Sequence, residues 1–114
     1  MLNKINRLTK DKDFDNVFQR GQASYNKITG AKAIVNQQRY SRFGILIGIK
    51  VSKKAVERNR AKRQIRGVIR LNMDRIKQGH DIIIIGLPDI LNKDYQEIEK
   101  SIISNFIKLR LLKK

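Results

Sequence analysis

Residues 80–86 read His-Asp-Ile-Ile-Ile-Ile-Gly, and this unbroken apolar run indicates how the chain folds. A half-buried strand alternates apolar and polar side chains, whereas a strand covered on both faces is apolar throughout. The run therefore predicts a buried strand at the centre of a sheet. Pro88, the only proline of the chain, predicts the end of this strand.

Two further strands are predicted upstream of this run, and residues 28–35 give the weaker signal. Residues 43–51 alternate at period two and predict a strand with one apolar face. Its other face carries two glycines and a lysine, which predicts a shallow surface that another backbone can approach closely. The alternative is that the glycines relieve crowding under a helix. The apolar face consists of Phe43, Ile45, Ile47, Ile49 and Val51.

A short helix is predicted over residues 9–19, because Phe14, Val17 and Phe18 fall at i, i+3 and i+4. Thr9 or Asp11 is expected to cap its start, and Gly21 follows its end.

Two longer helices are predicted at residues 55–76 and 92–112. The order helix, strand, strand, helix, strand, helix predicts an α/β (α+β) two-layer sandwich, in which a small sheet has one face covered by helices. The first of the two longer helices has a core-facing stripe. This stripe consists of Ala61, Ile65, Val68, Ile69, Asn72 and Ile76.

The composition predicts a single domain over residues 1–114 that binds a polyanion. Lys and Arg number 26 against 10 Asp and Glu, a net charge of +16, and such a field is tolerated where a polyanion neutralises it. The chain has no cysteine, one histidine, no apolar membrane span and no secretory signal, so we expect a cytoplasmic protein without thiolate metal sites. The cations do not form a basic amphipathic anchor, so nucleic acid is favoured over a membrane surface.

The charge is concentrated in residues 50–70, which carry nine basic residues and one acid. Their net charge of +8 is half that of the chain. Asn59, Arg63, Arg66 and Arg70 recur at i, i+4, i+7 and i+11, so they form a stripe opposite the apolar face of the helix. Solvated helix faces usually mix charges of both signs. A face of one sign, rich in arginine, favours contacts with phosphates.

The Arg-Asn-Arg run at residues 58–60, with Val-Ser-Lys-Lys at 51–54 before it and Ala-Lys-Arg after it, resembles the signature of the bacterial ribonuclease P protein component. Residues 13–18, Asp-Phe-Asp-Asn-Val-Phe, and the Arg-Gly pair that follows them resemble the first helix of that family. The Arg-Phe-Gly-Ile run at 42–45 is similar too. The likeness covers nearly the whole chain.

This resemblance implies a protein subunit of ribonuclease P that assists a catalytic RNA in removing the 5′ leader of precursor tRNA. It implies a left-handed crossover through the basic helix, although right-handed crossovers are the rule. The surface facing the catalytic RNA would consist of Lys53, Lys54, Arg58, Asn59, Arg60, Lys62, Arg63, Arg66 and Arg70. The cleft for the leader would be formed by Phe14, Phe18, Tyr25, Asn26, Lys27 and Lys32.

The chain also departs from the family pattern. The connection between Lys54 and Arg58 is shorter by a few residues. Lys32 stands where the family usually has an aromatic residue, so leader binding is expected to be more electrostatic. Phe14 and Phe18, at i and i+4, have the alternative of being core anchors.

No catalytic group is expected in the protein itself. The acidic cluster Asp11, Asp13 and Asp15 fits the first turn of a helix, and His80 precedes a buried strand. Catalysis is expected from the RNA, with Mg²⁺ held there or at the interface. The expected partners are the catalytic RNA and precursor tRNA, with no membrane and no obligate protein partner. The rival hypotheses are a structural RNA-binding protein, such as a ribosomal protein or RNA chaperone, and an architectural DNA-binding module.

Overall fold

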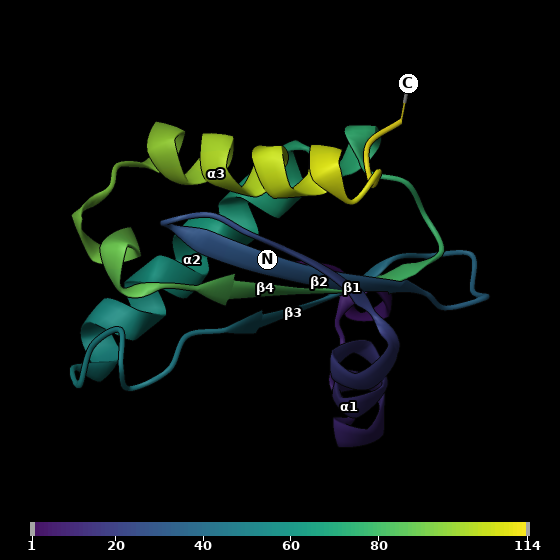
Figure 1. The fold of residues 1–114 in the computed structure, drawn as a ribbon, viewed down its shortest axis with the longest axis horizontal. Coiled ribbons are helices and arrows are strands. Elements are labelled where there is room, and N and C mark those ends of the chain that lie inside the picture. The colour runs from purple at the N-terminus through teal and green to yellow at the C-terminus, as the bar shows by residue number, and fades with distance from the viewer. Residues whose placement is uncertain (1, 114) are drawn as a thin grey trace.

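The computed structural model describes residues 2–113, and a four-stranded sheet lies at its centre (Figure 1). The spatial order is β1 (Gln22–Tyr25), β2 (Thr29–Val35), β4 (His80–Gly86) and β3 (Arg42–Leu46). Strand β4 pairs antiparallel with β2 and parallel with β3. As the run of isoleucines predicts, β4 is an inner strand, and Ile82, Ile83 and Ile84 are fully buried.

Three α-helices surround the sheet: α1 (Asp11–Arg20), α2 (Ala55–Leu71) and α3 (Tyr95–Lys108). Three short 3₁₀ turns, η1 (Lys4–Asn6), η2 (Met73–Arg75) and η3 (Pro88–Asn92), join them to the rest. Helices α2 and α3 cover one face of the sheet, and α1 lies against the other (Figure 1). The predicted α+β class is confirmed, and the predicted elements occur in the predicted order, with β1 as an additional strand. The cover of the second face by α1 differs from the prediction, which had helices on one face only.

The main core lies between the sheet and the pair α2 and α3. All six residues of the predicted stripe are buried, although Asn72 and Ile76 lie beyond the end of α2. Its five apolar members belong to one cluster with Ile98, Ile102 and Phe106 of α3 and the even-numbered isoleucines of β4. Complete burial of each large apolar side chain contributes about 1.5–3 kcal/mol. A smaller cluster on the opposite face joins Leu8, Val17 of α1 and Ile83.

Several predicted boundaries are wrong. The strand at 43–51 ends at Leu46, because the chain turns at Gly48, whose carbonyl accepts from the Val51 amide at 3.1 Å. Ile49 is consequently 68% exposed instead of facing the core. Strand β1 was not predicted, since its four residues show no alternation of apolar and polar side chains.

The helix ends also differ from expectation. Helix α1 begins after Lys10, and neither Thr9 nor Asp11 caps it. Helix α2 ends at Leu71 and η2 follows, where a continuous helix to Ile76 was predicted. Helix α3 is shorter than the predicted 92–112, because Asp94 and Glu97 form a capping box at its start.

Helix α1 is tied to the sheet by a charged network. Arg42 of β3 binds Asp81 of β4 through two hydrogen bonds, from Nε to Oδ1 at 2.8 Å and from Nη2 to Oδ2 at 2.7 Å. Its Nη1 also donates to Oδ2 of Asp13 in α1 at 3.3 Å. The hydrogen bond with Asp81 raises the pKa of Arg42, so the guanidinium stays charged. This network fixes the position of α1 relative to β3 and β4.

A buried polar network fixes α3 in the same way. The Thr29 and Ser101 hydroxyls are 2.6 Å apart. The Asn105 amide donates to the Thr29 carbonyl at 3.2 Å and accepts from the Ser24 hydroxyl at 2.9 Å. Polar groups at these depths specify one docking position, because a shifted helix would leave them unpaired.

None of the helices in residues 2–113 combines the length and the apolar composition that crossing a bilayer demands.

Candidate nucleic-acid interface

The outer face of α2 carries a row of polar side chains, five of them cations, and all are exposed except the half-buried Lys62. Asn59, Arg63, Arg66 and Arg70 stand along it, opposite the buried stripe, and Arg60 and Lys62 flank them. We call these six residues the arginine ridge. Within residues 2–113 no carboxylate forms a salt bridge with any of its cations. The inner face of α2 is therefore fixed in the core, while its outer face presents charges that no acidic side chain of the described residues neutralises.

Lys53, Lys54 and Arg58 stand at the start of α2. The two lysines are exposed. Arg58 is half-buried, and its Nη1 donates to the Ser52 carbonyl at 2.8 Å. The Ser52 hydroxyl donates to Glu57 and accepts from the Lys54 amide. Of the residues predicted to face RNA, Arg58 is thus turned inward to hold the shortened loop.

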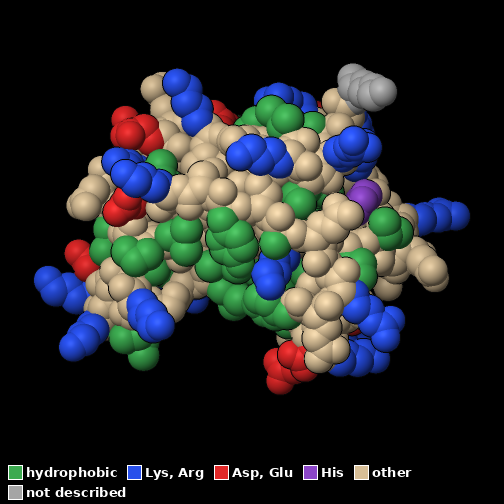
Figure 2. All heavy atoms as spheres, viewed as in Figure 1, with side chains coloured by type: hydrophobic (Ala, Val, Ile, Leu, Met, Phe, Trp, Pro, Cys, Tyr) green, Lys and Arg blue, Asp and Glu red, His purple; other side chains and the backbone are tan. Residues whose placement is uncertain are grey.

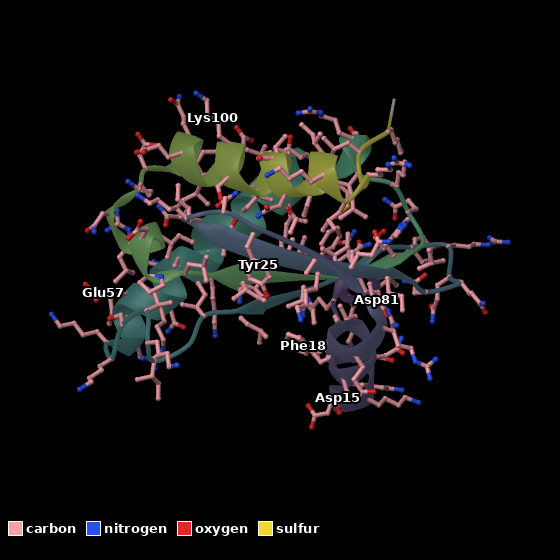
Figure 3. The ribbon with its side chains drawn as sticks, viewed as in Figure 1. Asp15, Phe18, Tyr25, Glu57, Asp81 and Lys100 are labelled. Carbon is pink, nitrogen blue, oxygen red and sulfur yellow. The ribbon has the colours of Figure 1, made fainter. Side chains whose placement is uncertain are left out.

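The opposite face of the sheet carries a second group of predicted residues. Strand alternation places Tyr25 and Lys32 on the side of Ile83, where α1 packs. Figure 3 shows Phe18 and Tyr25 on this same side. Phe18 is 38% and Tyr25 48% exposed, and the Lys32 ammonium lies 5.0 Å from the centre of the Phe18 ring. We call this surface, with Phe18, Tyr25 and Lys32, the α1 face.

An apolar surface flanked by cations suits single-stranded nucleic acid, because bases stack on rings while cations bind the backbone. In Figure 2 hydrophobic side chains gather beneath the sheet, between α1 and the start of α2, with Lys and Arg side chains around them. The α1 face therefore has the chemistry expected of the cleft.

Phe14 has a different environment from Phe18. It is half-buried and packs with Leu8 and Ile83. Its ring covers Gly44, where an added Cβ would lie 2.6 Å from the ring carbons. Phe14 therefore fits the alternative prediction of a core anchor. Gly44 fits the alternative that a glycine in this strand relieves crowding under a helix. Phe18 remains available to a partner.

Asn26 and Lys27 do not join the α1 face. The side-chain Oδ1 of Asn26 accepts from the Ile28 and Thr29 amides at 3.0 Å, and its Nδ2 donates to the Ser101 carbonyl of α3. Asn26 therefore shapes the turn between β1 and β2 and anchors it to α3. Lys27 is exposed at the tip of this turn.

Sequence reasoning missed Arg7. The segment before α1 runs along the edge of β3, where the Leu8 amide donates to the Phe43 carbonyl at 2.9 Å. Arg7, Lys62 and Arg66 together line a cavity of about 360 Å³ that also reaches Phe14. The cavity connects the arginine ridge to the α1 helix. No periodic pattern marks residues 2–9, so only the three-dimensional structure brings Arg7 to this place.

The acidic residues do not assemble into a metal site. Within residues 2–113 no group of three His, Asp or Glu side chains could hold an ion. Asp13 is engaged by Arg42, and the His80 Nδ1 lies 3.2 Å from the Gln78 carbonyl.

A helix with one buried face and one cationic face, on a small sheet with an aromatic and basic opposite surface, defines a nucleic-acid-binding protein of the α+β class. Comparison with known proteins specifies the family. The Ribonuclease P family model matches residues 2–110. The chain therefore belongs to the ribonuclease P protein component family, as the Arg-Asn-Arg motif predicts.

The relatives align with this chain over almost their whole length. The ribonuclease P protein component of Clostridioides difficile is 38% identical over 108 residues, covering 94% of this chain and 93% of the relative. That of Alkaliphilus metalliredigens is 35% identical over 107 residues, covering 94% and 96%. A solved structure of a Staphylococcus aureus RNase P protein, a mutant with defective mRNA degradation activity, superposes with a TM-score of 0.88 at 25% identity, covering 95% and 91%.

Membership of this family makes the chain the RNA-binding protein subunit of ribonuclease P, an endoribonuclease of tRNA processing, and its partner the ribonuclease P RNA. The rival hypothesis of a ribosomal protein or RNA chaperone is not favoured.

Proposed function

We propose that this protein binds the catalytic RNA through the arginine ridge and the 5′ leader of precursor tRNA through the α1 face. The observation that carries the proposal is the ridge itself, whose cations have no acidic partner in residues 2–113. Like charges at i+3 and i+4 cost a few tenths of a kcal/mol per pair. The phosphate groups of an RNA backbone offset this repulsion between the arginines when the RNA binds.

The proposed division of labour leaves hydrolysis to the RNA subunit. RNA-bound Mg²⁺ would supply the activated water, and the protein would hold the substrate and screen the repulsion between phosphates. The chain would act as one domain in the cytoplasm, without a membrane or an obligate protein partner. Lys53 and Lys54 would extend the ridge beyond the start of α2. Lys27 lies outside the α1 face, at the tip of the turn between β1 and β2, and would contact the leader only where the leader continues past that face.

The leader contact would combine stacking and charge. Phe18 and Tyr25 offer exposed rings, and stacking contributes about 1–3 kcal/mol per base without sequence preference. Lys32, over the Phe18 ring, brings an ammonium to the same place. This arrangement fits the prediction that leader binding is more electrostatic, because Lys32 stands where the family usually has an aromatic residue.

The direct test is cleavage of precursor tRNA by a bacterial ribonuclease P RNA at low Mg²⁺, with and without this protein. We expect cleavage to depend on the protein under these conditions. A second measurement compares the affinity of the assembled enzyme for precursor tRNA with and without its leader. Equal affinities would contradict the assignment of the α1 face, while absence of any stimulation would contradict the whole proposal.

A further inference from the structure

Gly67 lies in the middle of the arginine ridge, at a position where the fold has no need for glycine. It is an interior residue of α2 and does not have a positive φ. Glycine is among the least favourable residues in a helix interior. A Cβ at this position would meet only the Tyr95 ring, at 3.4 Å, which is an ordinary van der Waals contact. Neither the backbone nor the packing explains the glycine.

The surface over Gly67 is hollow. Arg63, Arg66 and Arg70 stand beside Gly67, and the four residues line a depression of about 320 Å³. All three arginines are exposed, and none forms a salt bridge within residues 2–113. The least favourable backbone position of the helix and three mutually repelling charges thus occur at the same place.

We propose that Gly67 and the three arginines form a seat for one phosphodiester group of the catalytic RNA. The absent side chain lets the RNA backbone approach the helix closely, and the three guanidinium groups donate hydrogen bonds to the phosphate oxygens. The proposal rests on the proposed function, because it assigns one contact within the ridge.

The lining of the hollow favours the sugar–phosphate backbone over a base. No exposed aromatic ring lines it, since its lining consists of Gly67 and the side chains of the three arginines. The Tyr95 ring lies beside Gly67, 3.4 Å from the position of an added Cβ, and its hydroxyl is buried. Direct contact with a phosphate oxygen is therefore the interaction that the site can offer.

The test is Gly67→Ala, whose effects on stability and on binding should have opposite signs. We expect the midpoint of thermal unfolding to rise by about 4 °C, because alanine is the better helix former and has room. We expect the affinity for a bacterial ribonuclease P RNA to fall about tenfold. The slope of log affinity against log salt should also decrease by about one unit.

The matched control is Ser104→Ala on the outer face of α3, which improves helix propensity away from the ridge. It should raise the unfolding midpoint and leave the affinity unchanged. If Gly67→Ala raises stability with unchanged affinity, the seat does not exist. If Gly67→Ala lowers stability, the space argument is wrong and the proposal is overturned. Arg63→Ala separates the two proposals, because unchanged RNA affinity in that variant would contradict the ridge itself.

Discussion

Helices α2 and α3 lie side by side on one face of the sheet, yet their outer faces differ completely. Both bury an apolar stripe in the same core. Helix α2 carries six cations and one acid, whereas α3 carries two of each. The Lys93–Glu97 pair at 4.0 Å, at the start of α3, is the usual arrangement of an exposed helix. Burial alone would not distinguish the two helices, so the pattern of charge identifies the functional one.

The largest expected effect comes from removing two charges of the ridge. We predict that Arg63→Ala with Arg66→Ala weakens binding to ribonuclease P RNA about hundredfold, or about tenfold for each. The salt slope should flatten by about one unit for each substitution. The corresponding change on α3, Lys100→Ala with Lys108→Ala, should have little effect. Measurement of affinity from 50 to about 400 mM salt tests both, and equal losses on the two helices would refute the comparison.

The α1 face should respond differently from either helix. We predict that Phe18→Ala weakens binding of precursor tRNA to the assembled enzyme about tenfold, through lost stacking. Binding of leaderless tRNA and of the RNA subunit should be unchanged. Tyr40→Ala is the control, because Tyr40 is similarly exposed, at 45%, but lies in the loop between β2 and β3. A loss of thermal stability alone would assign Phe18 to the core.

The smallest effect is predicted where α2 and α3 meet, at Tyr95. Its hydroxyl is buried and has no hydrogen-bond partner in residues 2–113. Tyr95→Phe should therefore increase the free energy of unfolding by about 1 kcal/mol, because the phenol loses its hydration on folding. Denaturant unfolding at neutral pH measures this difference, and a less stable variant would show that the hydroxyl is satisfied.

The same residue predicts a dependence on pH. Burial raises the pKa of Tyr95 above its ordinary value of 10.0. The unfolded chain then releases this proton at lower pH than the native chain. The contribution to stability is complete below the unfolded pKa and is lost as the pH rises through the folded one. The advantage of Tyr95→Phe should therefore widen above about pH 10, and a constant difference would contradict the assignment.

Regular patterns made much of this fold predictable. The inner stripe of α2 follows directly from the helical period of 3.6 residues. The buried strand β4 follows from its unbroken run of isoleucines. Strand β1 was missed because its identity comes from its partner, through pairs such as Tyr25 with Gly30. Ile49 continues the alternation of β3 in sequence, but the turn at Gly48 removes it from the sheet.

The candidate interface was predictable to the extent that it is periodic. The ridge has helical spacing, so its geometry could be deduced. The orientation of Arg58 depends on the Ser52 carbonyl, and the attachment of α1 depends on Asp13 and Arg42, which are 29 residues apart. The sequence shows that Gly67 falls inside a predicted helix, but its role could not be predicted, because the depression that it lines with the three arginines is seen only in the structure. Contacts of this kind arise only from tertiary structure.

The pairing of Leu8 with Phe43 has a consequence for self-association. Strand β3 lies at one end of the sheet, and unpaired strand edges are templates for aggregation between chains. The segment before α1 occupies part of that edge with a backbone hydrogen bond. At the other end, β1 is only four residues long. Two features therefore disfavour edge-to-edge pairing between molecules. The segment before α1 covers part of the β3 edge, and the β1 edge is too short to offer a long template.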